Sequence, residues 1–258
     1  MMRIAVVLFV AVTCSACLRS TTVISVKPDG SGTIVQETGV SPQMLAMVEG
    51  MAGGKSGQTP PVKEMFGEEQ ARKAADAMGV QFLSGEPIKT ADLEGYRARF
   101  AFADIGKLRM RLNQQTTASL EGKKTSDPPF GFAFEKGSSS SRLTIDMPDM
   151  QSPAEPLGLK NMDAGNAEQA QQAIAMMKMF TRGMFVDVSL DIDGRILKTD
   201  AQHVQGSRVT LLQLDFDTLL ANEAALQKLQ KATDLKGLSD IPGLKIVTNP
   251  KLNIEFAK

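Results

Sequence analysis

The first seventeen residues constrain this chain more than any other segment. A single basic residue, Arg3, precedes nine apolar residues from Ile4 to Val12, and small residues follow up to Cys17. This layout is typical of a secretory signal peptide. Nine apolar residues rise only about 14 Å as a helix, whereas the hydrocarbon core of a bilayer is about 30 Å thick. We therefore expect residues 1–16 to be a signal peptide that is removed.

The residues at the expected cleavage point resemble a known processing motif. Ser15-Ala16-Cys17 is similar to the end of a bacterial lipobox, which implies lipidation of Cys17. Cys14 departs from that motif, where an aliphatic residue is usual, so ordinary cleavage after Ala16 remains the alternative. Acyl chains contribute about 0.8 kcal/mol per buried CH₂ and hold a protein on a bilayer without a spanning helix. Leu18 follows the cysteine, and in the lipoprotein sorting pattern this favours the periplasmic face of the outer membrane.

Composition limits what the mature chain can do. The chain has two cysteines, Cys14 and Cys17, so processing leaves no internal disulfide and no thiolate metal site. Arg3 is the one charge before Cys17, which leaves 28 basic and 29 acidic residues. This balance gives no field that would attract nucleic acid. The absence of Trp and the single Tyr argue against aromatic platforms for sugars or single strands. We expect no cofactor.

Hydrophobic periodicity predicts an α+β fold, with antiparallel sheets and helices packed on one face. The clearest local signals are a hairpin across the turn Pro28–Gly32 and a helix that begins at Ser41-Pro42. Further helices are expected at 63–78, 166–180 and from Asp217 to about 232. Further strands are expected at 80–88, 96–102, 107–112, 130–134, 143–147, 184–192, 209–216 and within 244–256. Asp193-Gly194 is expected to turn strand 184–192 back into a hairpin.

Domain organisation follows from the length of the chain. About 240 residues suffice for one large domain or two modest ones. We expect residues 17–258 to form one α+β domain. The stretch 148–165 contains three prolines and no periodicity, and it is the candidate for an internal boundary.

One group of basic residues is a candidate binding face. Its members alternate with apolar residues in two expected strands, and they share one side if those strands are neighbours: Arg97, Arg99, Lys107, Arg109 and Arg111. Such a face suits phosphate headgroups or an acidic partner. The alternative is an ordinary solvated strand face.

Catalytic and metal-binding patterns are weak. The lone His203 lacks a nucleophile elbow nearby, and a surface or satisfied histidine is the simpler interpretation. Carboxylates for an exported hydrolase, the alternative function, would come from Asp187, Asp191 or Asp215. Residues from Ser189 to Asp200 partly imitate a calcium loop, but they lack the Glu at the twelfth position.

Methionines and glycines offer two further patterns. Met176, Met177, Met179 and Met184 could suit Cu(I) or an apolar ligand, although methionine is also a flexible core filler. The run Gly53-Gly54-Lys55-Ser56 lacks the first glycine of a phosphate loop, because Glu49 stands there.

The opening of the mature chain resembles a known family. Cys17 and the following run from Val23 to Thr33, with its Asp29-Gly30-Ser31-Gly32 turn, are similar to bacterial LppM-like lipoproteins. The resemblance covers about twenty residues and implies an envelope lipoprotein with an α+β domain that binds lipid. It brings no catalytic residues. We therefore expect a lipid-anchored, non-enzymatic protein of binding or structural role, whose partners are the membrane, through the N-terminal lipid, and a lipid or protein in the envelope.

Overall fold

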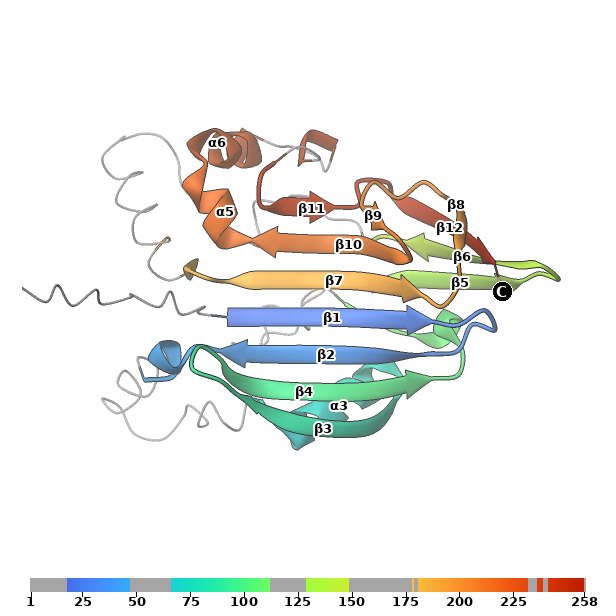
Figure 1. The fold of residues 1–258 in the computed structure, drawn as a ribbon, viewed down its shortest axis with the longest axis horizontal. Coiled ribbons are helices and arrows are strands. Elements are labelled where there is room, and N and C mark those ends of the chain that lie inside the picture. Colours follow the sequence, from blue (N-terminus) through green and yellow to red (C-terminus); the bar gives the residue numbers. More distant parts are fainter. Residues whose placement is uncertain are drawn as a thin grey trace, which may run out of the picture.

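Two sheets stacked against each other make up this computed structural model, which describes residues 18–46, 66–111, 129–148, 178, 181–231, 236–238 and 241–257. The main sheet has the order β11-β10-β7-β1-β2-β4-β3, with β9 paired to β10 (Figure 1). Its strands are β1 (Leu18–Val26), β2 (Gly32–Val40), β3 (Gln81–Lys89), β4 (Glu94–Phe102), β7 (Phe185–Ile192), β9 (Val204–Gln205), β10 (Arg208–Asp215) and β11 (Leu244–Ile246). The second sheet has the order β5-β6-β12-β8. Its strands are β5 (Gly131–Lys136), β6 (Ser140–Asp146), β8 (Ile196–Thr199) and β12 (Lys251–Ala257).

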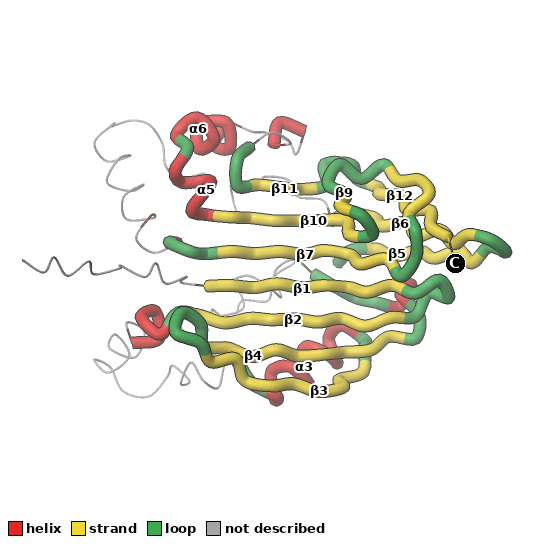
Figure 2. The backbone as a smooth tube through the Cα atoms, viewed as in Figure 1, coloured by secondary structure: helices red, strands yellow, loops and turns green. Residues whose placement is uncertain are grey.

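Helices are few and short in the described parts of the chain, so the fold is a sheet-dominated α+β arrangement (Figure 2). They are α3 (Glu68–Met78), α5 (Phe216–Ala221), α6 (Glu223–Lys231), the 3₁₀ turns η1 (Ile105–Lys107) and η5 (Lys236–Leu238), and a helical stretch at 42–46. α3 packs its buried Ala71, Ala75 and Met78 against the same side of the main sheet as the second sheet does. α5 and α6 cover that same side of β7, β10 and β11. The expectation of helices on one face is confirmed for these helices.

The core lies between the sheets. One cluster joins side chains from both sheets and α3, and its largest fully buried members include Phe100, Phe130 and Phe256. The opposite side of the main sheet, called here the outer face, carries the alternate residues of the same strands. Figure 1 looks onto this face, and none of the described elements packs across it. The side chains of the outer face are therefore the surface on which a partner could bind.

Local sequence signals at the start of the mature chain are confirmed. β1 and β2 form an antiparallel hairpin in register from Leu18↔Val40 to Val26↔Gly32. The Ser41 hydroxyl accepts a hydrogen bond from the Met44 N–H at 3.1 Å, as an N-cap does. α3 ends at Gly79 in the left-handed conformation, φ 72°, although it begins at Glu68 and not at 63.

The expected hairpin at Asp193-Gly194 is wrong. β7 pairs in parallel with β1 and antiparallel with β10, while β8 crosses to the second sheet and pairs with β12. The main sheet is therefore mixed and not purely antiparallel. The turn signal is local, but the partner of each strand is decided by non-local burial, because β7 buries Val186, Val188 and Leu190 in the centre of the main sheet.

Two further expectations need correction. No strand forms over 107–111, where η1 and an irregular segment follow β4; Leu108 and Met110 are buried in the core, and the Arg109 N–H bonds to the Met78 carbonyl at 3.0 Å. The helix expected after Asp217 is capped by Asp215, whose Oδ1 accepts from the Thr218 N–H at 3.1 Å, and it breaks at Asn222. Asp217 accepts instead from the Gly183 N–H at 2.8 Å.

Some expectations lie outside the described residues. These are the signal peptide and Cys17, the helix at 166–180 apart from Lys178, which is helical, and all but one end of the boundary at 148–165, together with Met176, Met177, Met179 and the glycine run at 53–56.

Candidate functional site

The expected lipid attachment point adjoins the centre of the main sheet. Leu18, the residue after Cys17, is the first residue of β1 and is 5% exposed. β1 is the fourth of seven strands in the order of the main sheet. Leu18 pairs with Val40 of β2, and the next residue, Arg19, pairs with Phe185 of β7. The fold therefore starts directly beside Cys17. Among the described residues, no helix is long and apolar enough to cross a bilayer.

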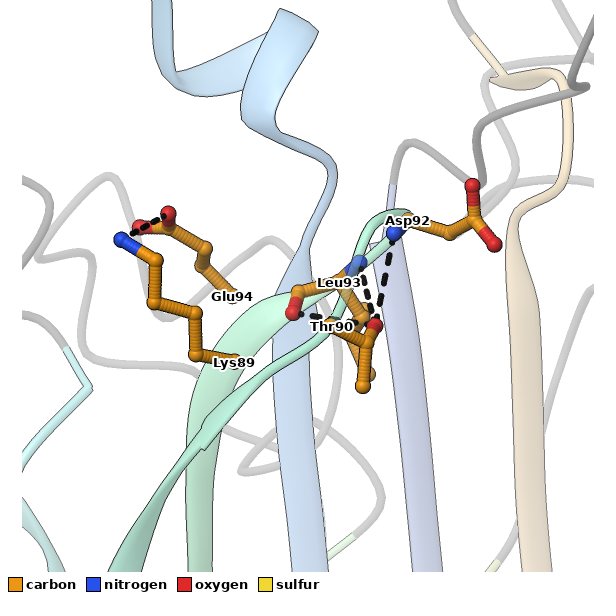
Figure 3. Close-up of polar contacts among 5 residues, drawn as sticks. All are labelled: Lys89, Thr90, Asp92, Leu93 and Glu94. Atoms are coloured by element: carbon orange, nitrogen blue, oxygen red, sulfur yellow. Dashed lines mark hydrogen bonds and ion pairs between the residues drawn. The ribbon is translucent and has the colours of Figure 1, made fainter.

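The strand ends around Leu18 form one end of the main sheet, called here the Leu18 end. Val40 pairs with Glu94 of β4, which in turn pairs with Lys89 of β3. Figure 3 shows the turn that joins these two strands: the Thr90 hydroxyl accepts from the N–H groups of Asp92 and Leu93 at 3.3 and 3.0 Å. Lys89 Nζ lies 3.0 Å from Glu94 Oε1 across the turn. The turn is fixed by its own side chains.

An apolar cluster covers the Leu18 end. Leu18 and Val40 are buried beneath four half-buried side chains, Met44, Leu45, Phe66 and Met184. We call these six residues the Leu18 cluster. At the same end of the sheet but on its outer face, the exposed Arg19 places its guanidinium carbon 5.1 Å from the centre of the Phe185 ring. Of the methionines considered as soft ligands, Met184 is the one that the structure describes, and it packs here.

The proposed basic face does not form as one surface. Arg97 and Arg99 lie on the outer face of β4, where Arg97 bonds to Glu37 Oε1 at 2.6 Å and Glu86 Oε1 at 2.8 Å. Their side chains extend from the side opposite to Ala98 and Phe100 of the core. Lys107 ends η1, and Arg109 and Arg111 follow it in an irregular segment on the core side, where the Arg109 N–H bonds to Met78 of α3. The condition of two neighbouring strands is not met; binding of an anionic partner stays a prediction for Arg97 and Arg99.

A second group of polar residues lies on the outer face of β7 and β10. Arg208 donates two hydrogen bonds to Asp191, from Nε to Oδ1 at 2.8 Å and from Nη2 to Oδ2 at 2.6 Å. This pairing raises the pKa of Arg208. Asp187 is half-buried on the same face of β7, four residues before Asp191. Burial raises the pKa of its carboxyl, whereas the Ser189 hydroxyl and the charges of Arg208 and Lys245 act to lower it. The pKa of the Asp187 carboxyl therefore lies above the ordinary value for aspartate.

Two buried polar atoms in this group lack partners. Ser189 pairs with Thr210 of β10, and Thr210 binds the His203 carbonyl through its N–H at 2.9 Å, so the three lie in one row. Ser189 Oγ and His203 Nε2 are buried without a hydrogen bond among the described residues. The Ser189 hydroxyl is near enough to Asp187 to lower the carboxyl pKa, but it makes no bond of normal geometry. Burial, and then the charge of Lys245, lowers the pKa of His203.

The three candidate hydrolase carboxylates do not converge. Asp191 is paired with Arg208, and Asp215 caps α5. Asp187 and Asp191 are four residues apart on one strand, which separates them by about 13 Å at ~3.3 Å per residue. Paired catalytic carboxylates in glycosidases are about 5–9.5 Å apart. The arrangement of these residues offers no acid–base pair.

The calcium-loop pattern is also dispersed. Ser189 is buried, and Asp200 accepts from the backbone N–H and the side-chain amide of Asn253 at 2.7 and 3.0 Å. No group of three or more His, Cys, Asp or Glu side chains is placed to hold a metal ion in the described part of the chain.

A shallow hollow lies at the opposite end of the main sheet, called here the Gly30 end after the β1–β2 turn. It has a volume of about 220 Å³ and is lined by Ser25, Lys27, Gly32, Thr33, Asp191, Ile192 and Asp193. The lining mixes one cation with two carboxylates, so the hollow suits a polar partner group. The sequence could not single it out, because it depends on the parallel pairing of β1 with β7.

Comparisons with known proteins give one distant likeness. No protein-family model matches the chain, and no curated protein matches it. Among solved structures, the folded domain of the Mycobacterium tuberculosis LppM protein aligns over 95% of this chain and 92% of that chain, with 9% sequence identity and a TM-score of 0.35. This protein bears the name of the family that the first hairpin resembles. A TM-score this low does not establish a shared fold, so the site is interpreted from its own residues.

Proposed function

We propose that this chain is a lipid-anchored protein of the bacterial envelope with a non-enzymatic binding role. The observation that carries the proposal is the start of β1: Leu18, the residue after Cys17, is buried and paired with Val40, and the next residue, Arg19, is paired on both sides. The first strand of the described fold therefore begins two residues after the expected cleavage point. Acylation of Cys17 would hold the domain on the periplasmic face of the outer membrane.

The outer face is the surface that we assign to partner binding. It presents paired charges, such as Arg208 with Asp191, and the exposed Arg99. The hollow at the Gly30 end continues this surface at the end of β1 remote from Cys17. An anchored domain would thus hold a polar binding surface away from the bilayer.

A lipid or apolar ligand within the domain has less support. The described interior between the sheets is filled by side chains that are almost fully buried, among them Phe100, Ile145 and Leu190. Native mass spectrometry of the chain from Leu18 onward, purified without detergent, tests this ligand. A co-purifying lipid mass would favour it, and a clean apo mass would favour protein contacts.

The anchor is tested with the two cysteines of the chain. Cys17→Ser should move the protein from the membrane fraction to the soluble periplasmic fraction. Cys14→Ser, three residues away, is the matched control and should stay membrane-bound with an acyl mass on Cys17. A Cys17→Ser protein that remains in the membrane fraction would contradict the anchor.

The binding surface is tested by crosslinking in the envelope. A photoreactive residue at Thr33, in the hollow, should capture a partner, whereas the same residue at Lys73, exposed on α3, should not. Arg99→Glu should lower the yield at Thr33 several-fold, and Lys73→Glu should leave it unchanged. Equal capture from both positions would refute the assignment of this face.

A further inference from the structure

We propose that the Leu18 end of the main sheet rests on the bilayer that holds the anchor, with the half-buried side chains of the Leu18 cluster in contact with lipid. The inference rests on the proposed anchor at Cys17 and adds an orientation to it. The domain would stand on one end of its strands, and not hang from the anchor on a free tether.

The reach of the chain limits where the bilayer can be. One residue spans at most about 3.6 Å, and one peptide unit separates Cys17 from Leu18. Leu18 is held in register with Val40, and Arg19 is held in register with both Phe185 and Gly39. Moving Leu18 away from the membrane would require separating the central strand from its neighbours. The acyl chains therefore bring this end of the sheet to the headgroups.

The side chains at this end have the chemistry of a membrane interface. Met44, Leu45, Phe66 and Met184 are each only half-buried over Leu18 and Val40. At the same end of the sheet, on the outer face, the exposed cation of Arg19 lies over the Phe185 ring. Apolar and aromatic side chains enter the boundary between headgroups and acyl chains, and a basic residue beside them pairs with lipid phosphate. One lipid surface can therefore contact both the apolar side chains of the Leu18 cluster and the cation of Arg19.

The absence of tryptophan makes the contact measurable. Phe66→Trp, with Met44→Trp as a second reporter, places a unique fluorophore in the Leu18 cluster. Lys27→Trp is the control: Lys27 is exposed in the β1–β2 turn, at the far end of a nine-residue strand that spans roughly 30 Å. Each variant is first checked for native circular dichroism and thermal unfolding.

The anchor is supplied chemically, so the test does not depend on processing in the cell. Each variant of the chain from Cys17 onward is coupled through the Cys17 thiol to maleimide-phospholipid in phosphatidylcholine–phosphatidylglycerol vesicles, with and without brominated acyl chains. The chain from Cys17 onward has no other cysteine, so coupling occurs at this thiol alone. All described residues are retained.

We expect brominated lipid to quench Phe66→Trp and Met44→Trp at least twofold, with a blue shift of their emission, and to leave Lys27→Trp unchanged. Equal quenching at all three positions, or none at positions 66 and 44, would overturn the proposed orientation. Failure of the anchor itself would appear separately, as a Cys17→Ser protein that stays membrane-bound in cells.

Discussion

Arg208 and Asp191 form a two-pronged ion pair across β10 and β7, with nitrogen–oxygen distances of 2.8 and 2.6 Å. The two residues are a cross-strand pair in the register of the sheet, so the backbone already places them opposite each other. The fork geometry of arginine matches both carboxylate oxygens. Asp191 of this pair also lines the hollow at the Gly30 end.

Loss of this pair should have a small effect on stability. The side chains are 48% and 34% exposed, so solvent screens most of the attraction. We expect Asp191→Asn and Arg208→Gln each to lower the free energy of unfolding by about 0.5–1 kcal/mol, measured by urea denaturation. A double-mutant cycle should give a coupling of the same size, and a coupling near zero would show that the pair contributes no net stability.

The stability of the fold should fall in mild acid because of His203. Burial lowers the pKa of this histidine in the folded state, so the unfolded chain binds a proton first as the pH falls. The contribution is fully present above the unfolded pKa, about 6.5, and it is lost as the pH drops from there to the lower folded pKa.

His203 is the single histidine of the chain, so one substitution isolates this effect. We expect the difference in unfolding free energy between pH 7.5 and pH 5.5 to shrink in His203→Gln. Wild type and variant should be compared by urea denaturation at both values. An unchanged difference would assign the pH dependence to carboxyl groups instead.

Much of this fold is predictable at short range. The hairpin at Asp29-Gly30, the caps at Ser41 and Gly79 and most strands follow from periodicity and turn chemistry within a few residues. The parallel pairing of β1 with β7 joins residues that are 166 positions apart, such as Arg19 and Phe185, and no local pattern encodes it. The hollow depends on this pairing, and Lys107 is separated from Arg97 because the chain leaves the sheet after β4. Sequence reasoning could therefore name these residues without placing them correctly.

The start of β2 should tolerate no side chain at Gly32. A Cβ atom there would overlap the Ser25 carbonyl oxygen and crowd the Phe102 ring, which is itself nearly buried. Overpacking of this kind costs about 1–3 kcal/mol or more. We expect Gly32→Ala to lower the thermal midpoint by several degrees.

Gly206→Ala is the control for that substitution. Gly206 has open space around its Cβ position but a φ of +63°, so its cost is limited to the left-handed backbone, roughly 1–2 kcal/mol. A thermal midpoint for Gly32→Ala at or above that of Gly206→Ala would contradict the close approach of β1 and β2.

Ser189 of β7 and Ser141 of β6 are a matched pair of buried hydroxyls, one without and one with a hydrogen-bond partner in the described part of the chain. Both are at most 1% exposed, but Ser141 Oγ donates to the Pro28 carbonyl at 2.7 Å, whereas Ser189 Oγ has no partner among the described residues. A satisfied hydrogen bond contributes about 1 kcal/mol, and a buried hydroxyl without a partner is a cost. Ser141→Ala should therefore destabilise the protein by about 1 kcal/mol, and Ser189→Ala should be neutral or stabilising in urea denaturation. If Ser189→Ala destabilises the fold as much as Ser141→Ala, the Ser189 hydroxyl has a hydrogen-bond partner within the folded chain, and the prediction fails.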